Sequence, residues 1–118
     1  MTKKELEKRL IDFSVAVLKA IDQINNDKKS LNLAEQLVRS CTSAALNYGE
    51  AQSAESKKDF IHKISIIMKE LRETQINLSI LRQINPQLDS SDFQKILSEN
   101  DELLAIFHKT IQTARKNP

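Results

Sequence analysis

Cysteine and histidine, the side chains that most often serve as nucleophiles, general bases or metal ligands, occupy only three of the 118 positions. His62 and His108 fall in separate predicted helices. Neither has the Glu-x-x-His or His-x-x-x-His spacing that presents two ligands to one metal ion. Cys41 has no Cys-x-x-Cys partner and lies on an apolar helical face, where cysteine usually acts as a small buried hydrophobic residue. These patterns predict no metal site and no reactive thiol.

Hydroxyl and carboxylate groups are the remaining candidates for catalysis. The hydroxyls of residues 40–43 have no neighbouring His or Lys that could act as a base, and a single glycine cannot build a phosphate-binding loop. We therefore predict no catalytic residue, no cofactor and no small-molecule substrate. One enzymatic alternative remains, a site between subunits that pairs Glu50 or Glu70 with Arg39 or Arg72. Such pairs form structural networks as readily as catalytic ones.

Helices must position all of these side chains, because one glycine, two prolines and no tryptophan are too few turn-forming residues for a sheet protein. Apolar residues recur at steps of three and four in four segments, which predicts helices over about 3–24, 31–52, 56–84 and 90–115. The polar run 25–30 is predicted as a turn. Short connections favour a single domain, 1–118, folded as an antiparallel up-down-up-down four-helix bundle.

Local signals mark the ends of these helices. Ser56 and Asp59 match a capping box at the start of the third helix, and the dipeptide 85–86, Asn-Pro, ends it. Asp89 or Ser90 is expected to cap the fourth helix. The predicted core positions are Leu6, Leu10, Phe13, Val17, Ile21, Ile24, Leu33, Leu37, Cys41, Ala44, Tyr48, Phe60, Ile64, Ile67, Leu71, Gln75, Leu78, Leu81, Phe93, Leu97, Leu104, Phe107, Ile111 and Ala114.

The segment 39–53 holds the only Gly, Cys and Tyr of the chain. Gly49 and Ala45 continue a strip of small residues at spacings of four, and a helical Gly costs about 1 kcal/mol relative to Ala. The strip therefore predicts that a neighbouring helix approaches closely. Asn47, Tyr48 and Glu50 are predicted to be polar residues of a subunit interface or of the internal structure. The alternatives are an exposed Asn47 and a Tyr48 that stacks on a nucleic-acid base.

The third helix is apolar on more than one side, since seven of the twelve residues from Phe60 to Leu71 are apolar. A helix of this kind is normally buried on several sides. We interpret the second apolar stripe as a contact between subunits of a homo-oligomer. The alternative is a broad core face with a few scattered surface isoleucines.

The net charge of +2 says little about partners, so the distribution of charge matters more. Glu70 and Glu73 are predicted to bridge subunits or to form internal pairs. In an oligomer, a repeated basic face could neutralise several phosphates of a nucleic acid, although a solvated helix face is the simpler explanation. The basic residues predicted to contact nucleic acid are Arg39, Lys57, Lys58, Lys63, Lys69 and Arg72.

The single cysteine, an N-terminus without an apolar signal segment, and the lack of an apolar run of about 20 residues predict a cytoplasmic protein without a membrane segment.

A group of residues between positions 39 and 74 resembles the signature of the four-helix bundle family of 23S rRNA intervening-sequence proteins. The family pattern reads approximately RS-x-x-S-x-x-A-N-Y-x-E-A-Q-S-A-E-S-K-x-D-F-I-H-K, followed by K-E-x-R-E-T. The residues of this chain that match are Arg39, Ser40, Ser43, Ala45, Asn47, Tyr48, Glu50 to Lys57, Asp59 to Lys63, Lys69, Glu70, and Arg72 to Thr74.

This resemblance implies a small bacterial all-α protein that assembles as a ring-shaped homopentamer without catalytic activity. Some members of the family are encoded within insertions in 23S rRNA genes. A related branch assists the reverse transcriptases of diversity-generating retroelements, and it tends to be more basic than this chain. Asn77 stands where the family often has Trp, so the packing or stacking role of that Trp is expected to be absent.

The predicted function is therefore a non-enzymatic homo-oligomeric scaffold, with a pentamer favoured, that contacts RNA or an RNA-handling protein. The alternative is a protein-interaction module without nucleic-acid contact.

Overall fold

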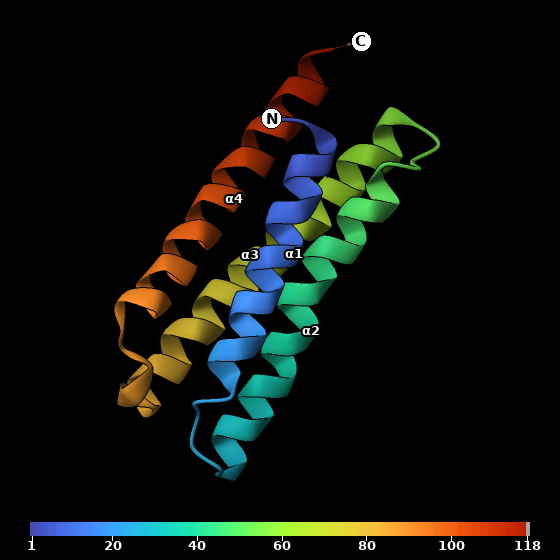
Figure 1. Cartoon of the computed structure of the whole chain (residues 1–118). Helices are drawn as coiled ribbons and strands as arrows, with labels where there is room; N and C mark the ends of the chain where they lie inside the picture. The colour runs from blue at the N-terminus through green and yellow to red at the C-terminus, as the bar shows by residue number, and fades with distance from the viewer. Residues whose placement is uncertain (118) are drawn as a thin grey trace.

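The chain folds into an all-α bundle of four long helices (Figure 1). The computed structural model describes residues 1–117 and contains no strand in that range. The helices are α1 (Lys3–Ile21), α2 (Lys28–Ala51), α3 (Lys57–Ile84) and α4 (Ser91–Lys116), and a short 3-10 turn, η1 (Pro86–Leu88), joins α3 to α4. The molecule is elongated, about 50 × 25 × 20 Å. The predicted all-α class and the four helices are thus confirmed.

The connection between α1 and α2 differs from the prediction. Helix α1 ends at Ile21 instead of about residue 24, and α2 begins at Lys28 instead of about residue 31. The Asp27 carboxylate accepts a hydrogen bond from the Ser30 N–H at 2.8 Å, which starts the helix earlier than the first apolar residue. Part of the polar run predicted as a turn is therefore helical.

Serine side chains begin α3 and α4 at the predicted places. The Ser56 hydroxyl accepts a hydrogen bond from the Asp59 N–H at 3.0 Å. The Asp59 carboxylate accepts from the Glu55 N–H at 3.4 Å rather than from Ser56, so only half of the predicted capping box forms. Ser90, not Asp89, caps α4.

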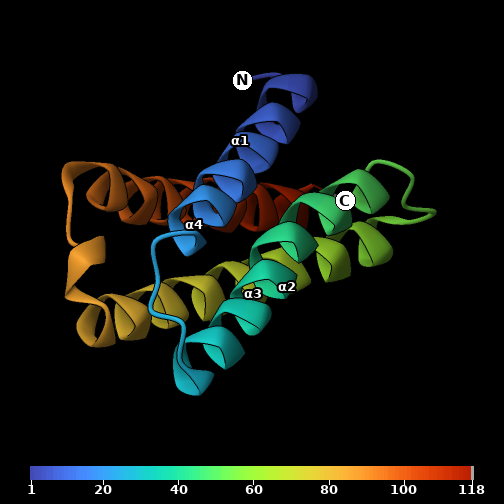
Figure 2. The same cartoon turned by 60° about the horizontal axis from the view of Figure 1, so that its bottom comes forward.

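Helix α3 is the central helix of the bundle, because it packs extensively against α2 on one side and α4 on the other. Helix α1 packs mainly on α2, touches α4 less, and is inclined to α4 (Figure 2). Between Phe60 and Leu71, four of the seven apolar side chains of α3 are buried and the other three are half-buried. The subunit thus buries most of this apolar face, while Phe60, Ile61 and Ile66 keep part of their surface exposed. The interpretation of the second stripe as a subunit contact stays a prediction.

Most of the predicted core positions are buried. At one predicted core position the adjacent residue is buried instead: Leu103 is fully buried, whereas Leu104 is half-buried. The predicted core residues that are half-buried are Ile21, Ile24, Leu33, Phe60, Gln75, Leu104 and Ala114.

Buried hydroxyl groups join α2 to each of its neighbours. The Ser14 hydroxyl of α1 donates to the Cys41 carbonyl oxygen of α2 at 3.1 Å. The hydroxyls of Ser40 in α2 and Thr74 in α3 lie 2.8 Å apart, in hydrogen-bond contact. All of these side chains are buried, so each bond forms in a region that excludes water and links two helices at one fixed register.

Two buried asparagines make further links with α3. The Asn77 amide donates to the Leu33 carbonyl oxygen of α2 at 3.1 Å, and the Asn100 amide of α4 donates to the Leu71 carbonyl oxygen at 3.0 Å. The side-chain oxygen of each asparagine has no hydrogen-bond partner among the described residues. Each asparagine therefore carries part of the desolvation cost of a buried polar group.

Asn85 ties the loop between α1 and α2 to the end of α3. Its side-chain oxygen accepts from the Asn25 N–H at 2.7 Å, and its amide donates to the Ser30 hydroxyl and the Leu81 carbonyl oxygen, both at 3.1 Å. Asn85 is fully buried. These bonds hold residue 25 in the loop, which accounts for the early end of α1.

We expect Asn85→Ala to lower the free energy of unfolding by about 2 kcal/mol, because it leaves the Asn25 N–H without its partner in a part-buried site. Chemical denaturation measures this change. Asn26→Ala, at an exposed position of the same loop, is the matched control and should change stability by less than about 0.5 kcal/mol. Equal effects of the two substitutions would contradict the assigned role of Asn85.

Candidate functional site

A groove runs along the outer side of the α2–α3 pair. It has a volume of about 530 Å³. Its floor lies over the Ser40 hydroxyl and Asn77, which link the two helices beneath. The groove is lined by Leu33, Gln36, Arg39, Ser40 and Ser43 of α2 and by Glu70, Glu73, Ile76, Asn77 and Ile80 of α3. We refer to this surface as the α2–α3 groove.

Three charged side chains face this groove. Arg39 and Glu73 are exposed, Glu70 is half-buried, and none of them forms an ion pair with any of the described residues. Burial raises the pKa of Glu70, and the negative charge of Glu73 raises it further. The positive charges of Lys69 and Arg39 partly offset this effect, because they lower the pKa of Glu70. The groove thus offers a guanidinium and two carboxylates to a molecule that binds there.

Large apolar side chains lie beside these charges. Ile76 and Ile80 line the groove with exposed fractions of 62% and 43%. Leu46, with an exposed fraction of 68%, lines a second hollow of about 530 Å³ that shares Arg39 and Ser43 with the groove. The outer side of α2 and α3 therefore combines apolar and charged groups, a composition typical of protein interfaces.

Asn47 and Tyr48 have different surroundings although they are adjacent in sequence. Asn47 is half-buried, and its amide donates to the Ser43 carbonyl oxygen at 2.9 Å, so within the subunit it bonds to its own helix. Tyr48 is buried and makes an edge-to-face contact with Phe107 of α4, with 5.6 Å between the ring centroids. Burial also raises the pKa of Tyr48. Its ring belongs to the core, so the alternative of base stacking is wrong.

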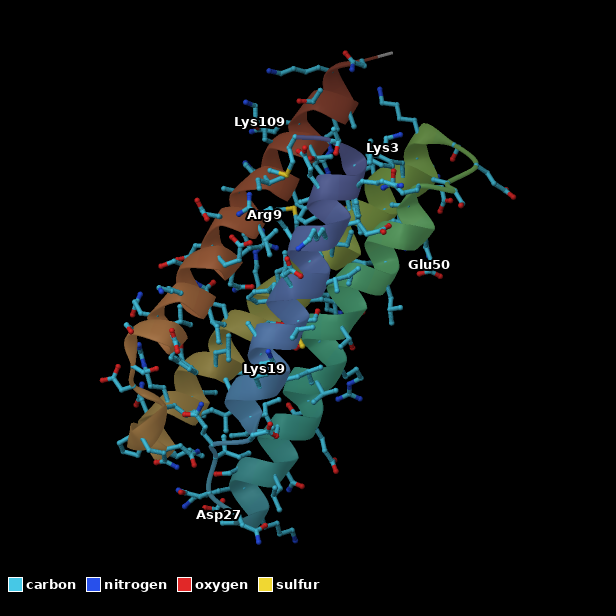
Figure 3. All side chains as sticks on the ribbon, in the orientation of Figure 1. Lys3, Arg9, Lys19, Asp27, Glu50 and Lys109 are labelled. Atoms are coloured by element: carbon cyan, nitrogen blue, oxygen red, sulfur yellow. The ribbon has the colours of Figure 1, made fainter. Side chains whose placement is uncertain are left out.

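Glu50 lies near the end of α2 and points away from the bundle (Figure 3). Its carboxylate is 3.7 Å from the Lys63 ammonium of α3, an ion pair in which the Glu50 side chain is 61% exposed. Exposed pairs of this kind contribute little to stability. The pair takes Lys63 out of the predicted basic group and directs it toward α2.

The other five predicted basic residues lie at three different places on the surface. Lys58, Lys69 and Arg72 are exposed and lie on one side of α3, since their spacings of eleven and three residues bring them back to nearly the same direction. Lys57 is exposed at the start of α3, whereas Arg39 lines the α2–α3 groove next to two carboxylates. The six basic residues therefore do not form one continuous face.

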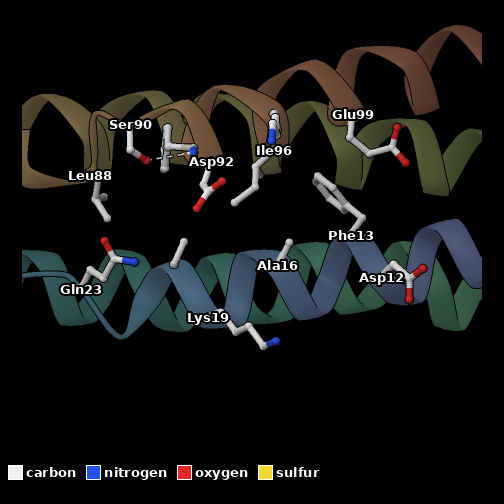
Figure 4. Close-up of a pocket in the computed structure, with 13 residues that line it drawn as sticks. Asp12, Phe13, Ala16, Lys19, Gln23, Leu88, Ser90, Asp92, Ile96 and Glu99 are labelled. Carbon is white, nitrogen blue, oxygen red and sulfur yellow. Dashed lines mark hydrogen bonds between the residues drawn. The ribbon is translucent and has the colours of Figure 1, made fainter.

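A second groove, about 390 Å³ in volume, lies between α1 and α4. Phe13 and Ile96 point into the space between the two helices, while Lys19 points away from it (Figure 4). Beside it, the Arg9 guanidinium donates to both carboxylate oxygens of Glu99, with an Nε–Oε2 distance of 3.0 Å, and this contact raises the pKa of Arg9. The groove combines an apolar floor with charges of both signs on its rim.

Known proteins resemble this chain in both sequence and fold. The family model for the 23S rRNA-intervening sequence protein matches residues 3–109. The chain belongs to this family. A crystal structure of a protein of unknown function from the S23 ribosomal protein family of Bacteroides thetaiotaomicron has a similar fold, with a TM-score of 0.80 and 26% sequence identity. The match covers 90% of this chain and 97% of that chain. No curated protein matches the sequence.

In this 23S rRNA-intervening sequence protein, many signature residues gather on the α2–α3 pair. Ser40 and Thr74 meet inside the pair, and Arg39, Glu70 and Glu73 line the groove outside it. These five residues, which come from two separate stretches of the sequence, therefore meet on one helix pair.

Some of the structurally important polar residues in this member of the family were not predicted. Asn77 is buried and donates to the Leu33 carbonyl oxygen of α2, a packing role that the sequence did not predict. Asn100 lies three residues after Leu97 and four residues before Leu104. This spacing could have been used to predict that Asn100 is buried in the core. The Arg9–Glu99 contact joins residues 90 positions apart, and no local pattern marks it.

Metal ligands do not cluster in this protein: within residues 1–117, no group of three or more His, Cys, Asp or Glu side chains could hold a metal ion. His62 and His108 are both exposed. None of the helices in this range is long and apolar enough to cross a bilayer.

The Cys41 thiol should react slowly in the folded protein. Cys41 is buried, and burial raises the pKa of its thiol from 9.0 to about 11. At pH 8 the shift alone lowers the thiolate fraction about 100-fold, because each pKa unit is a factor of ten. We expect labelling by a thiol reagent to be at least about 100-fold slower in buffer than in denaturant. Comparable rates in both solutions would show that the thiol is accessible.

Gly49 does not make room for another helix of the same chain, so the predicted close approach stays a prediction for a helix of a second copy. It is exposed, and a Cβ atom built at this position would meet no atom within 4 Å. We therefore expect Gly49→Ala to raise the free energy of unfolding by about 0.5–1 kcal/mol, through better helix propensity alone. Thermal or chemical denaturation measures the change. A loss of stability would mean that another molecule occupies the space beside Gly49.

Proposed function

We propose that this 23S rRNA-intervening sequence protein is a non-enzymatic subunit of a ring-shaped homo-oligomer that contacts RNA or an RNA-handling protein in the cytoplasm. The subunit in this proposal is an antiparallel up-down-up-down bundle, and a pentamer is the favoured assembly. Membership of the family supports the link to RNA. The absence of enzymatic activity is supported by the buried thiol of Cys41 and by the hydroxyl of Ser40, which is engaged with Thr74.

The observation that carries RNA contact is the part of the outer side of α3 that does not line the α2–α3 groove. Lys58, Lys69 and Arg72 are exposed there and form no ion pair with the described residues. At a rise of about 1.5 Å per residue, Lys58 and Arg72 lie about 21 Å apart along α3. A ring would repeat this set in every subunit, and each lysine or arginine that meets a phosphate releases condensed counterions. This gain favours binding of a polyanion.

Support for an oligomer comes from surface that the subunit leaves uncovered. Leu46, Ile76 and Ile80 are exposed beside three unpaired charges in and around the α2–α3 groove. Large exposed apolar side chains beside a groove are a feature of many interaction sites. Because the broad apolar face of α3 is mostly buried inside the subunit, the larger exposed apolar groups of the α2–α3 groove are the surface that our proposal assigns to assembly.

The triple charge reversal Lys58→Glu, Lys69→Glu and Arg72→Glu tests RNA contact. We expect it to weaken binding of a structured RNA hairpin by at least about tenfold near 100 mM salt and to flatten the salt dependence of the affinity, because fewer counterions are released. Fluorescence anisotropy titrations at several salt concentrations measure both quantities.

Lys95→Glu, Lys109→Glu and Lys116→Glu provide the matched control, since they make the same change of net charge at exposed positions of α4. This control should retain most of the affinity. If both triple variants lose affinity equally, the α3 face has no special role. If the unmodified protein shows no salt-dependent RNA binding at all, the alternative of a protein-interaction module without nucleic-acid contact is favoured.

A further inference from the structure

Helix α1 carries an apolar stripe that the described residues 1–117 cover only in part. Ile11, Val15 and Leu18 follow one another at spacings of four and three, and their exposed fractions are 48%, 43% and 38%. Leu31 and Val38 of α2, with exposed fractions of 46% and 37%, add to the exposed apolar surface of the α1–α2 pair. We call the first three residues the α1 stripe.

A basic end precedes the α1 stripe. Lys4 is exposed and lies seven residues before Ile11, which places it on the same side of the helix. Lys8 lies close to that side and contacts Asp12 at 2.6 Å, with the two side chains 76% and 61% exposed. Along the outer side of α1, the basic residues Lys4 and Lys8 therefore come before the apolar residues of the α1 stripe.

The α3 wall of the α2–α3 groove has the complementary order. Glu70 and Glu73 come first, and Ile76 and Ile80 follow. The span from Glu70 to Ile80 is ten residues, about 15 Å of helix, and the span from Lys4 to Val15 is eleven residues, about 16.5 Å. Figure 1 draws α1 and α3 running in the same direction, from the upper end to the lower end. Two copies standing side by side could thus place acidic groups against basic ones and apolar groups against apolar ones.

We propose that the α2–α3 groove of one copy receives the α1 stripe of the next copy, an inference that rests on the homo-oligomer proposed above. Lys4 then lies opposite the Glu70 and Glu73 end of the groove, where the two carboxylates outnumber the single guanidinium of Arg39. Ile11 and Val15 lie opposite the isoleucines of the groove. Since the groove and the stripe are different surfaces of one subunit, the contact is heterologous, and repeating it closes a ring if the rotation between copies allows. The order of charged and apolar groups on α1 and its direction relative to α3 both fit the groove, which favours a second copy of this chain over an unrelated partner.

Two variants that each remove one half of the contact test this proposal. The groove variant carries Ile76→Lys and Ile80→Lys, and the stripe variant carries Val15→Lys and Leu18→Lys. All four positions are at least 38% exposed, so both variants should keep their helical circular dichroism. We expect each variant alone to have the 13.5 kDa mass of one chain by light scattering, and an equimolar mixture to form a dimer and nothing larger.

The mixture is informative because the intact stripe of the groove variant can bind the intact groove of the stripe variant, while the two remaining halves are blocked. Ala105→Lys with Gln112→Lys, at exposed positions of α4, is the control and should assemble as the unmodified protein does. If the unmodified protein assembles but the mixture forms no dimer, or the single variants still assemble, this contact is wrong and the proposed ring stands. A monomeric unmodified protein would overturn both.

A charge exchange at exposed positions gives a second test that leaves the apolar packing unchanged. Lys4→Glu and Glu73→Lys should each weaken assembly on their own, and the chain carrying both should regain it, because the contact joins the two positions of neighbouring copies. If the doubly substituted chain assembles no better than the single variants, Lys4 and Glu73 do not face each other.

Discussion

The buried contact between α2 and α3 is the interaction on which the rest of the structure depends. Ser40 and Thr74 meet in its interior, and Asn77 donates to the α2 backbone nearby. This contact fixes the two helices along most of their length, so that α1 can pack on α2 and α4 can pack on α3. Its outer side is the α2–α3 groove, into which Arg39, Glu70 and Glu73 project their charges.

Polar groups in this core select one alignment of the helices. Apolar seams with steps of three and four tolerate a shift of one helix along another, because equivalent side chains recur at each heptad. A shift would separate the hydroxyls of Ser40 and Thr74. It would also leave the buried Asn100 amide without the Leu71 carbonyl oxygen, at a cost of about 1–3 kcal/mol. The unpartnered oxygens of Asn77 and Asn100 show that this selectivity itself carries a cost.

Periodicity was sufficient to predict the helices, most of the core and the burial of Cys41, because these features depend on local spacing. The end of α1 was missed, since Asn85 sets it from 60 residues away. How much of the wide apolar face of α3 is buried inside the subunit could not be predicted, because sequence does not show that α3 lies between two neighbours. The open space beside Gly49 and the separation of Lys63 from Lys58 likewise depend on how helices are arranged around α2 and α3.

The most direct measurement of the central contact is a double-mutant cycle with Ser40→Ala and Thr74→Val. Denaturation of the unmodified protein, the two single variants and the double variant gives the coupling free energy between these hydroxyls. A buried hydrogen bond that links α2 to α3 predicts a coupling of about 0.5–1.5 kcal/mol. Additive effects of the two substitutions, within about 0.3 kcal/mol, would contradict the account.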